Sequence, residues 1–228
     1  MNHADALKIA QGLVREIEPA CERCEIAGGV RRGKENPHDI ELVLVQRPGA
    51  PKLEFGQRIP AHKSVLERRL WHMEQEYLIK PVSGKDKLKK FDVDPDKFGV
   101  VMAGYVRLEL YIVTEPAEWG PLFTIRTGPS DFSHWLVTPR RQRGCMPDGY
   151  VQHQGAVWPG RRVSTTEVKI TGEKLSMPEE LDYLRFLGLG WIEPGDRQAK
   201  WNYFKADNAV NGLITDSRIK AEETDGER

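Results

Sequence analysis

The sequence predicts an α/β protein in which a mixed sheet with flanking helices is followed by a smaller α+β unit. Three observations predict this class: helical apolar spacing near the N-terminus, two apolar strand-like runs that carry acids, and a change of composition after Thr114. At 228 residues the chain is long enough for a real core in one compact unit or two small lobes. We expect one lobe over residues 1–114, a second over 115–200, and a C-terminal tail over 201–228 whose charged end is disordered.

Each element has its own sequence signal. Apolar residues at helical spacing predict a helix over 5–18 that ends at Pro19. A short strand over 24–30 runs into a Gly28-Gly29 turn, and a β-branched, apolar strand follows from Asp39 to Gln46. The remaining elements are a loop over 48–60, a helix over 63–79, one or two strands over 100–113, and a helix over 178–187 that begins with a proline and two acids and is capped by Gly188.

Composition excludes some classes of protein and leaves others open. No apolar stretch approaches the roughly 18 residues needed to span a bilayer, and no export signal is visible at the N-terminus. We therefore expect a cytoplasmic protein, and three cysteines fit a reducing compartment. The 34 basic and 34 acidic side chains cancel, which is not typical of a nucleic-acid binder. Two local cationic clusters, each as readily explained as solvated surface, are Lys85, Lys87, Lys89 and Lys90, and Arg140, Arg141 and Arg143.

Acidic side chains interrupt the two apolar strands. Because successive side chains of a strand point to opposite faces, Asp39 and Glu41 share one face. The intervening Ile40 and the following Leu42 would pack on the other face. Glu109 lies in a later apolar run in the same way. Carboxylates on apolar strands are costly to bury unless cations meet them, so the pattern predicts two divalent metals, the arrangement that drives in-line phosphoryl transfer.

Glycine before the acids has a matching physical reason. A backbone that approaches a triphosphate closely cannot carry a side chain there, and its exposed N–H groups cradle anionic oxygens. Gly28-Gly29 can do this, and Arg31 and Arg32 can neutralise phosphate charge. Taken singly, the glycines also fit an ordinary tight turn, and the acids fit a solvated sheet face, with Glu109 paired to Arg107. Their conjunction and spacing favour a site.

These residues carry a resemblance. The run Gly28-Gly29-Val30-Arg31-Arg32-Gly33-Lys34-Glu35, followed by Asp39-Ile40-Glu41, resembles the signature of family X DNA polymerases, the DNA polymerase beta-like branch of the nucleotidyltransferase superfamily. The family writes Gly-Ser-x-Arg-Arg-Gly and then Asp-x-Asp at this spacing. Its third carboxylate lies in Arg-x-Asp on a later strand, to which Arg107-Leu108-Glu109 is similar.

The resemblance continues beyond the predicted palm. Arg126-Thr127-Gly128 with Phe132 is similar to the family's Tyr-Phe-Thr-Gly segment at the palm–thumb junction. Residues 146–150 resemble a thumb turn, and 179–197 resemble the end of the thumb. The similarity spans roughly residues 5 to 200. It rests on the order and spacing of the segments, and it implies a nucleotidyltransferase palm followed by a small thumb.

The resemblance also implies roles for single residues. Asp39 and Glu41 would bind both of two Mg²⁺ ions, and Glu109 would bind the ion that activates a primer 3′-hydroxyl; all three would be catalytic, and Mn²⁺ could substitute. The residues implied to bind the nucleotide are Gly28, Gly29, Arg32, Thr127 and Gly128. The residues implied to bind DNA are Lys85, Lys87, Lys89, Lys90 and Arg107. The implied partners are a dNTP and primer-template or gapped DNA, bound by a monomer without a membrane.

The sequence departs from the family pattern at several points. Glu41 and Glu109 stand where the family has aspartate, and each moves the carboxylate by about 1.5 Å, so we expect a lower rate or a preference for Mn²⁺. Gly29 replaces a serine that contacts phosphate. Ile125-Arg126 replaces the aromatic pair that selects the sugar, and Ser133 replaces an asparagine that reads the nucleotide edge. Sugar selectivity and fidelity are therefore expected to be low.

The chain begins almost directly at the predicted first palm helix, so we expect no deoxyribose-phosphate lyase activity and a weak grip on DNA. Reduced members of this kind occur in viruses, and a viral or phage origin fits. Two other functions remain open: a template-independent nucleotidyltransferase acting on RNA ends, a small molecule or a protein, and an inactive paralogue that only binds DNA.

Other candidate residues carry weaker signals. Cys21-Glu22-Arg23-Cys24 lacks the second pair or the histidines of a zinc site. His38 adjoins Asp39, where a surface position fits better than a place near the metals. Tryptophans in the second half fit the core of a small thumb better than a base-stacking platform; they are Trp119, Trp135, Trp158, Trp191 and Trp201.

Overall fold

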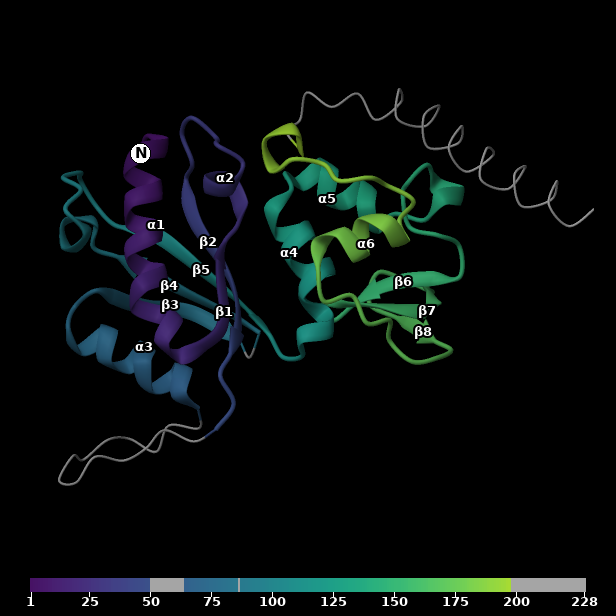
Figure 1. Ribbon diagram of the computed structural model, residues 1–228, viewed down its shortest axis with the longest axis horizontal. Coiled ribbons are helices and arrows are strands. Elements are labelled where there is room, and N and C mark those ends of the chain that lie inside the picture. Colours follow the sequence, from purple (N-terminus) through teal and green to yellow (C-terminus); the bar gives the residue numbers. More distant parts are fainter. Residues whose placement is uncertain (50–63, 86, 198–228) are drawn as a thin grey trace, which may run out of the picture.

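The computed structural model describes residues 1–49, 64–85 and 87–197, which form two α/β lobes side by side (Figure 1). The strands are β1 Cys21–Ile26, β2 Asp39–Gln46, β3 Ile79–Lys85, β4 Leu88–Val93, β5 Val106–Val113, β6 Tyr150–His153, β7 Ala156–Arg162 and β8 Val168–Ile170. The α-helices are α1 His3–Ile17, α2 Gly28–Arg31, α3 Val65–Gln75, α4 Trp119–Thr127, α5 Ser130–Val137 and α6 Glu180–Phe186. Short 3-10 helices are η1 Glu18–Ala20, η2 Pro95–Phe98, η3 Pro116–Glu118, η4 Arg140–Gln142 and η5 Pro194–Arg197.

Two sheets establish the fold class. The first lobe holds a five-stranded sheet in the order β1-β2-β5-β4-β3, and the second holds a three-stranded sheet in the order β6-β7-β8. In the larger sheet β2 and β5 run parallel, and the other neighbours are antiparallel. A mixed sheet with flanking helices and a smaller antiparallel sheet confirm the predicted α/β class.

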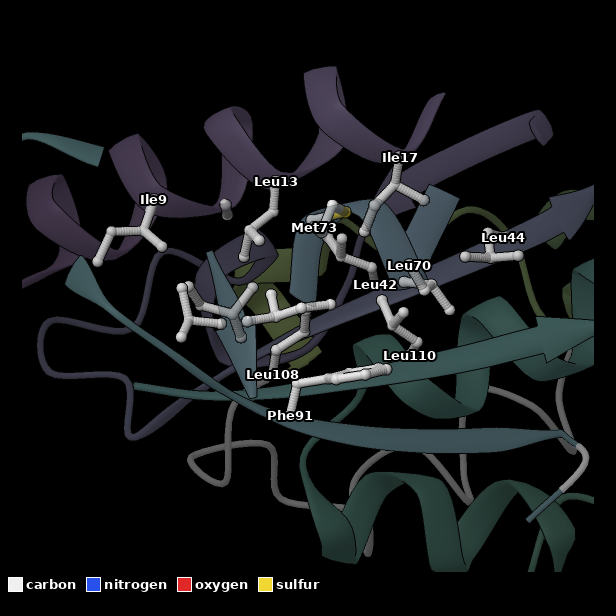
Figure 2. Close-up of a cluster of buried hydrophobic side chains, with 14 of the residues drawn as sticks. Ile9, Leu13, Ile17, Leu42, Leu44, Leu70, Met73, Phe91, Leu108 and Leu110 are labelled. Atoms are coloured by element: carbon white, nitrogen blue, oxygen red, sulfur yellow. The ribbon is translucent and has the colours of Figure 1, made fainter. Parts of the chain in front are cut away.

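Helices α1 and α3 cover one face of the large sheet. Asn2 caps α1 by accepting a hydrogen bond from the Asp5 backbone N–H at 2.9 Å, and Pro19 lies in the 3-10 turn that follows. Figure 2 shows side chains of both helices meeting those of the sheet. These buried core residues include Ile9, Leu13, Ile17, Leu42, Leu44, Leu70, Met73, Phe91, Leu108 and Leu110.

The opposite face of the sheet joins the two lobes. Val43 and Val45 of β2 are buried there in one cluster with Val113 of β5 and with Trp119 and Phe123 of α4. Alternate residues of β2 share a face, so this apolar patch continues the face on which the two predicted acids of β2 lie. One end of that face is therefore acidic, and the other end packs against the second lobe.

The second lobe has its own core. Helices α5 and α6 and the small sheet bury a cluster that contains Phe132, Trp135, Met146 and Tyr183. The prediction that tryptophans serve the core of the second lobe is confirmed for Trp135. Trp119 is also buried, but in the cluster that joins the two lobes. Trp191 is 46% exposed, and Trp201 lies outside the described residues.

Several element predictions were wrong. The strand expected over 24–30 ends at Ile26, and Gly28-Gly29 begins the helical turn α2. Ile79, expected to end a helix, begins strand β3. The hairpin of β3 and β4 was not predicted, because Pro81, Gly84 and the lysine cluster are poor strand formers. Residues 100–105 form no strand. The predicted tail and most of the predicted loop over 48–60 lie outside the described residues.

In the part of the chain that the structure describes, no helix is both long and apolar enough to cross a membrane.

Candidate active site

The pairing of β2 with β5 sets the positions of the three predicted acids. In this parallel register Glu41 stands opposite Glu109, and Asp39 stands opposite Arg107. Neighbouring strands lie about 4.7–4.9 Å apart, so Glu41 and Glu109 are adjacent. Asp39 lies on the same face of β2, two residues before Glu41. At the level of the backbone, the fold thus brings Glu109 next to two acids, Asp39 and Glu41, that lie far from it in the sequence.

Glu41 lies in an environment that disfavours its charge. Burial raises its pKa to about 7, and the negative charges of Asp39 and Glu109 act in the same direction. The positive charges of Arg126 and Arg32 oppose this effect but do not cancel it. At neutral pH the Glu41 carboxyl is therefore close to half protonated. A cation bound beside it would favour its ionised form.

Glu109 lies in a different environment. Burial opposes its ionisation, but hydrogen bonds from the Lys90 ammonium and the Tyr111 hydroxyl outweigh burial, so its pKa lies below the usual value. Burial and the bond to Glu109 raise the pKa of Tyr111, which stays a neutral donor. Arg126 lies over the Tyr111 ring, 4.1 Å from its centroid, and donates to its hydroxyl at 3.3 Å. Glu109 is thus held in its ionised form.

Gly28 meets Glu41 directly. Its φ is +62°, a left-handed conformation that glycine adopts without strain. A Cβ at this position would lie 1.8 Å from Oε2 of Glu41, so only glycine leaves room for that carboxylate. The Ala27 N–H also donates to the Glu41 carbonyl oxygen at 2.8 Å. The glycine turn, expected to cradle phosphate, is packed in this structure against a predicted metal ligand.

The two arginines of the turn reach the second lobe. Arg32 Nη1 donates to the carbonyl oxygen of Thr127 at 2.7 Å. Arg31 donates to the Thr127 hydroxyl at 2.7 Å and to Glu180 Oε2 at 2.6 Å. Glu180 also accepts from Nη1 of the fully buried Arg197 at 2.9 Å. Thr127, predicted to lie against the nucleotide sugar, is itself buried at the joint between the lobes.

A pocket of about 330 Å³ opens beside Glu41. The end of α4, the start of α5 and the glycine turn form its walls. Its lining residues are Arg32, Glu41, Ile125, Arg126, Gly128, Pro129, Ser130 and Ser133. Two arginines facing one carboxyl make the pocket positive, which suits an anionic ligand. The Arg126 Nε is buried there with no hydrogen-bond partner among the described residues.

The predicted DNA-binding residues have varied surroundings. Lys87 donates to Glu118 Oε2 at 3.2 Å and to the Gln154 carbonyl oxygen at 3.1 Å, so it joins the β3–β4 hairpin to the second lobe. Lys90 contacts Glu109. Arg107 pairs with Asp92 at 3.2 Å, and not with Glu109. Lys89 lines a separate pocket beside Trp71. The side chain of Lys85 lies outside the described part.

Three residues of this site were missed or assigned another role by sequence reasoning. Tyr111 follows Glu109 by one strand alternation, so the period-2 rule places it on the same face. Arg126 was noted only as the replacement of an aromatic residue, although its position next to Thr127 indicated the pocket. Lys90 was predicted to contact DNA, and only the pairing of β4 with β5 shows that it stands opposite Glu109.

In this structure the carboxyl oxygens of Asp39, Glu41 and Glu109 do not form a metal site. Among the described residues, no group of three or more histidine, cysteine, aspartate or glutamate side chains is arranged to hold a metal ion. In this structure the Glu109 carboxylate accepts hydrogen bonds from Lys90 and Tyr111. Cys21 is buried and donates to the Ile17 carbonyl oxygen at 3.4 Å, which fits a structural role. His38 is exposed.

Comparison of the chain with protein-family models gives no match, and comparison with curated proteins gives no significant one. The resemblance to family X polymerases therefore stays a prediction based on the motifs and their spacing.

Proposed function

We propose that the protein is a nucleotidyltransferase, most specifically a minimal template-directed DNA polymerase that adds dNMP to a primer 3′-hydroxyl and releases pyrophosphate. The observation that supports it is the parallel register of β2 and β5. That register aligns Glu109 with Glu41, next to Asp39, and Glu41 itself lines a positive pocket. The gap-filling activity and the DNA repair role implied by the resemblance belong to the same proposal.

The donor set fits divalent metal in its chemistry. Three carboxylates share one face, and Glu41 keeps a raised pKa because the two nearby arginines do not compensate burial and like charge. Asp39 and Glu41 would hold both of two Mg²⁺ ions, with Mn²⁺ as a substitute, and Glu109 would hold one. Such ions stabilise the attacking and leaving oxygens of an in-line displacement. To bind the ion, Glu109 would give up its ion pair with Lys90.

The protein's own cations act on the triphosphate. Arg32 and Arg126 line the pocket beside Glu41, and both are positioned to neutralise phosphate oxygens. Arg32 is held by the Thr127 carbonyl oxygen, which orients the guanidinium before a ligand arrives. Burial lowers the pKa of Arg32, and the charges of Glu41 and Asp39 oppose that effect, so it keeps its charge. Preformed positive charge of this kind is the main electrostatic aid to phosphoryl transfer.

A primer-extension assay tests the proposal. A labelled primer at a one-nucleotide gap is incubated with each dNTP singly and with Mg²⁺ or Mn²⁺. Extension by the complementary dNTP alone supports a template-directed polymerase. Extension irrespective of template supports a template-independent transferase, and DNA binding without extension supports an inactive paralogue.

Two variants make the assay specific to the site. Asp39→Asn keeps the shape of the side chain but removes a metal ligand, so product formation should fall by at least about a hundredfold. Glu25→Gln removes one carboxylate from the exposed part of β1 and should retain the wild-type rate. Wild-type activity in Asp39→Asn would place the chemistry elsewhere.

A further inference from the structure

The second cationic cluster of the sequence, at residues 140–143, takes no part in the acid site. Arg140 is structural: its Nη2 donates to the Leu187 carbonyl oxygen at 3.0 Å and its Nε to that of Cys145 at 3.3 Å. Arg141 instead faces a pocket of about 450 Å³ within the second lobe. That pocket has no role in the proposed chemistry.

Three separate segments build this pocket. They are the turn after α5, the start of β6 and the end of β7 with the loop that follows it. Arg141, Arg161 and Arg162 all line it, and Asp148 is the one acid among its lining residues. With three arginines and one acid, the lining residues of the pocket carry an excess of positive charge.

That charge is weakly compensated. Arg141 and Asp148 are 3.5 Å apart, and each side chain is 55% exposed, a geometry in which ion pairs contribute little. Arg162 donates to two carbonyl oxygens, of Gln152 at 3.4 Å and of Thr165 at 3.3 Å. Carbonyl oxygens orient a guanidinium without neutralising it. An anion with several acceptor oxygens would complete the site, and phosphate matches the planar donors of arginine.

The pocket is connected to the candidate active site. Ser130 lines both the pocket beside Glu41 and a neighbouring one against α5. Gln142 lines that neighbouring pocket and also the arginine pocket. The three pockets therefore follow one another along α5 and η4. A chain molecule that has one unit at the acids can therefore place a later unit at the arginines.

We propose that the pocket of Arg141, Arg161 and Arg162 binds a backbone phosphate of a DNA strand whose reacting end lies at the acid site. The inference rests on the proposed function for the identity of the ligand. Because the chain has no net charge, its grip on DNA depends on local positive sites of this kind. The phosphate comes from an internal phosphodiester or from the 5′-terminal phosphate at the far side of a gap.

The test compares two triple variants of equal charge change. One is Arg141→Gln/Arg161→Gln/Arg162→Gln. The other, as control, is Arg15→Gln/Lys80→Gln/Arg185→Gln, which removes three exposed cations elsewhere in the two lobes. All six side chains are at the surface, so both proteins should fold. Circular dichroism checks that they do.

Binding is measured by fluorescence anisotropy with a labelled gapped duplex, without dNTP, between about 50 and 200 mM salt. Removing the pocket arginines should lower the slope of log Kd against log salt by about 1, the value for one lost phosphate contact, and weaken binding at least about tenfold. The control should keep the wild-type slope. Two gapped duplexes, one with a 5′-phosphate and one with a 5′-hydroxyl at the gap, separate the two sources of the phosphate. If the pocket variant loses affinity only for the 5′-phosphate duplex, the pocket binds the terminal phosphate. If it loses affinity equally for both duplexes, the pocket binds an internal phosphodiester.

Equal losses in both triple variants would overturn the inference, because they would reflect general charge. An unchanged slope in the pocket variant, or binding to RNA alone, would also overturn it. Primer extension at saturating DNA keeps the two proposals apart. If the wild type extends primers while the pocket variant binds DNA normally, only the pocket inference is refuted. If the wild type binds DNA through the pocket but does not extend primers, only the proposed function is refuted.

Discussion

Replacement of Glu41 by glutamine should stabilise the metal-free protein at alkaline pH while it abolishes nucleotidyl transfer. The folded protein holds the Glu41 pKa at about 7, against an ordinary value of 4.5, through burial and then the charge of Asp39. The folded state therefore binds more protons than the unfolded state between these two values. Its stability is fully present below about pH 4.5 and is lost as the pH rises through about 7.

The magnitude follows from the same two values. Their difference corresponds to about 3.5 kcal/mol, at about 1.4 kcal/mol for each pKa unit. Partial exposure and coupling to Asp39 reduce this figure, so we expect about 2 kcal/mol. Glutamine has nearly the same shape and no charge. The difference in unfolding free energy between Glu41→Gln and wild type should therefore grow by about 2 kcal/mol from about pH 5 to about pH 8.

Urea denaturation in EDTA at both pH values measures this double difference. Glu109→Gln is a matched control, since bonds from Lys90 and Tyr111 hold the Glu109 pKa below its usual value. The stability that ionised Glu109 contributes is present above about pH 4.5 and is lost only at lower pH, so the difference between Glu109→Gln and wild type should stay nearly constant from about pH 5 to about pH 8. A pH-independent difference for Glu41→Gln would refute the reasoning, because the carboxyl would then be solvated and not crowded by like charge.

Three further outcomes are expected. Mg²⁺ at a hundred times its dissociation constant should stabilise the wild type near pH 8 by about 2.7 kcal/mol and Glu41→Gln by much less, as read by thermal unfolding; equal gains would argue against metal at Glu41. Gly28→Ala and Gly33→Ala both place a side chain at positive φ, for about 1–2 kcal/mol of strain each, but only Gly28 lies against Glu41, so Gly28→Ala alone should lose about a hundredfold in rate. Glu180→Gln leaves the fully buried Arg197 without its carboxylate and should cost about 3–5 kcal/mol in urea denaturation; a loss below about 1 kcal/mol would mean that the pair is solvated.

Part of this site was accessible from the sequence. Period-2 alternation correctly placed Ile40, Leu42 and Leu44 in the core, where they are fully buried. The remaining step, that Glu109 lies opposite Glu41, depends on the parallel pairing of strands far apart in the chain. Local pattern contains no information on that register, so only the family resemblance suggested it.

The glycine turn shows a second limit. A glycine pair before the acids indicates a close approach of the backbone, but not what approaches it. In the structure the approaching group is the Glu41 carboxylate and not empty space for phosphate. The β3–β4 hairpin was missed for a different reason: Pro81 and Gly84 weaken the local strand signal, and the pairing with β5 overrides it.

The acidic face of β2 also explains why the second lobe sits where it does. Along one side of the strand, acids at its start give way to Val43 and Val45, and these bury against Trp119 and Phe123 of α4. The apolar end thereby anchors the helix whose C-terminal turn carries Arg126 and the pocket. Bonds from the glycine turn to the same helix end tie the pocket to the backbone beside the acids. Arg32 belongs to the same lobe as the acids, whereas Arg126 belongs to α4 of the second lobe. A change in lobe orientation would therefore alter the distance between the carboxylates and Arg126. Binding of DNA across the second lobe is therefore expected to affect the rate of transfer as well as affinity.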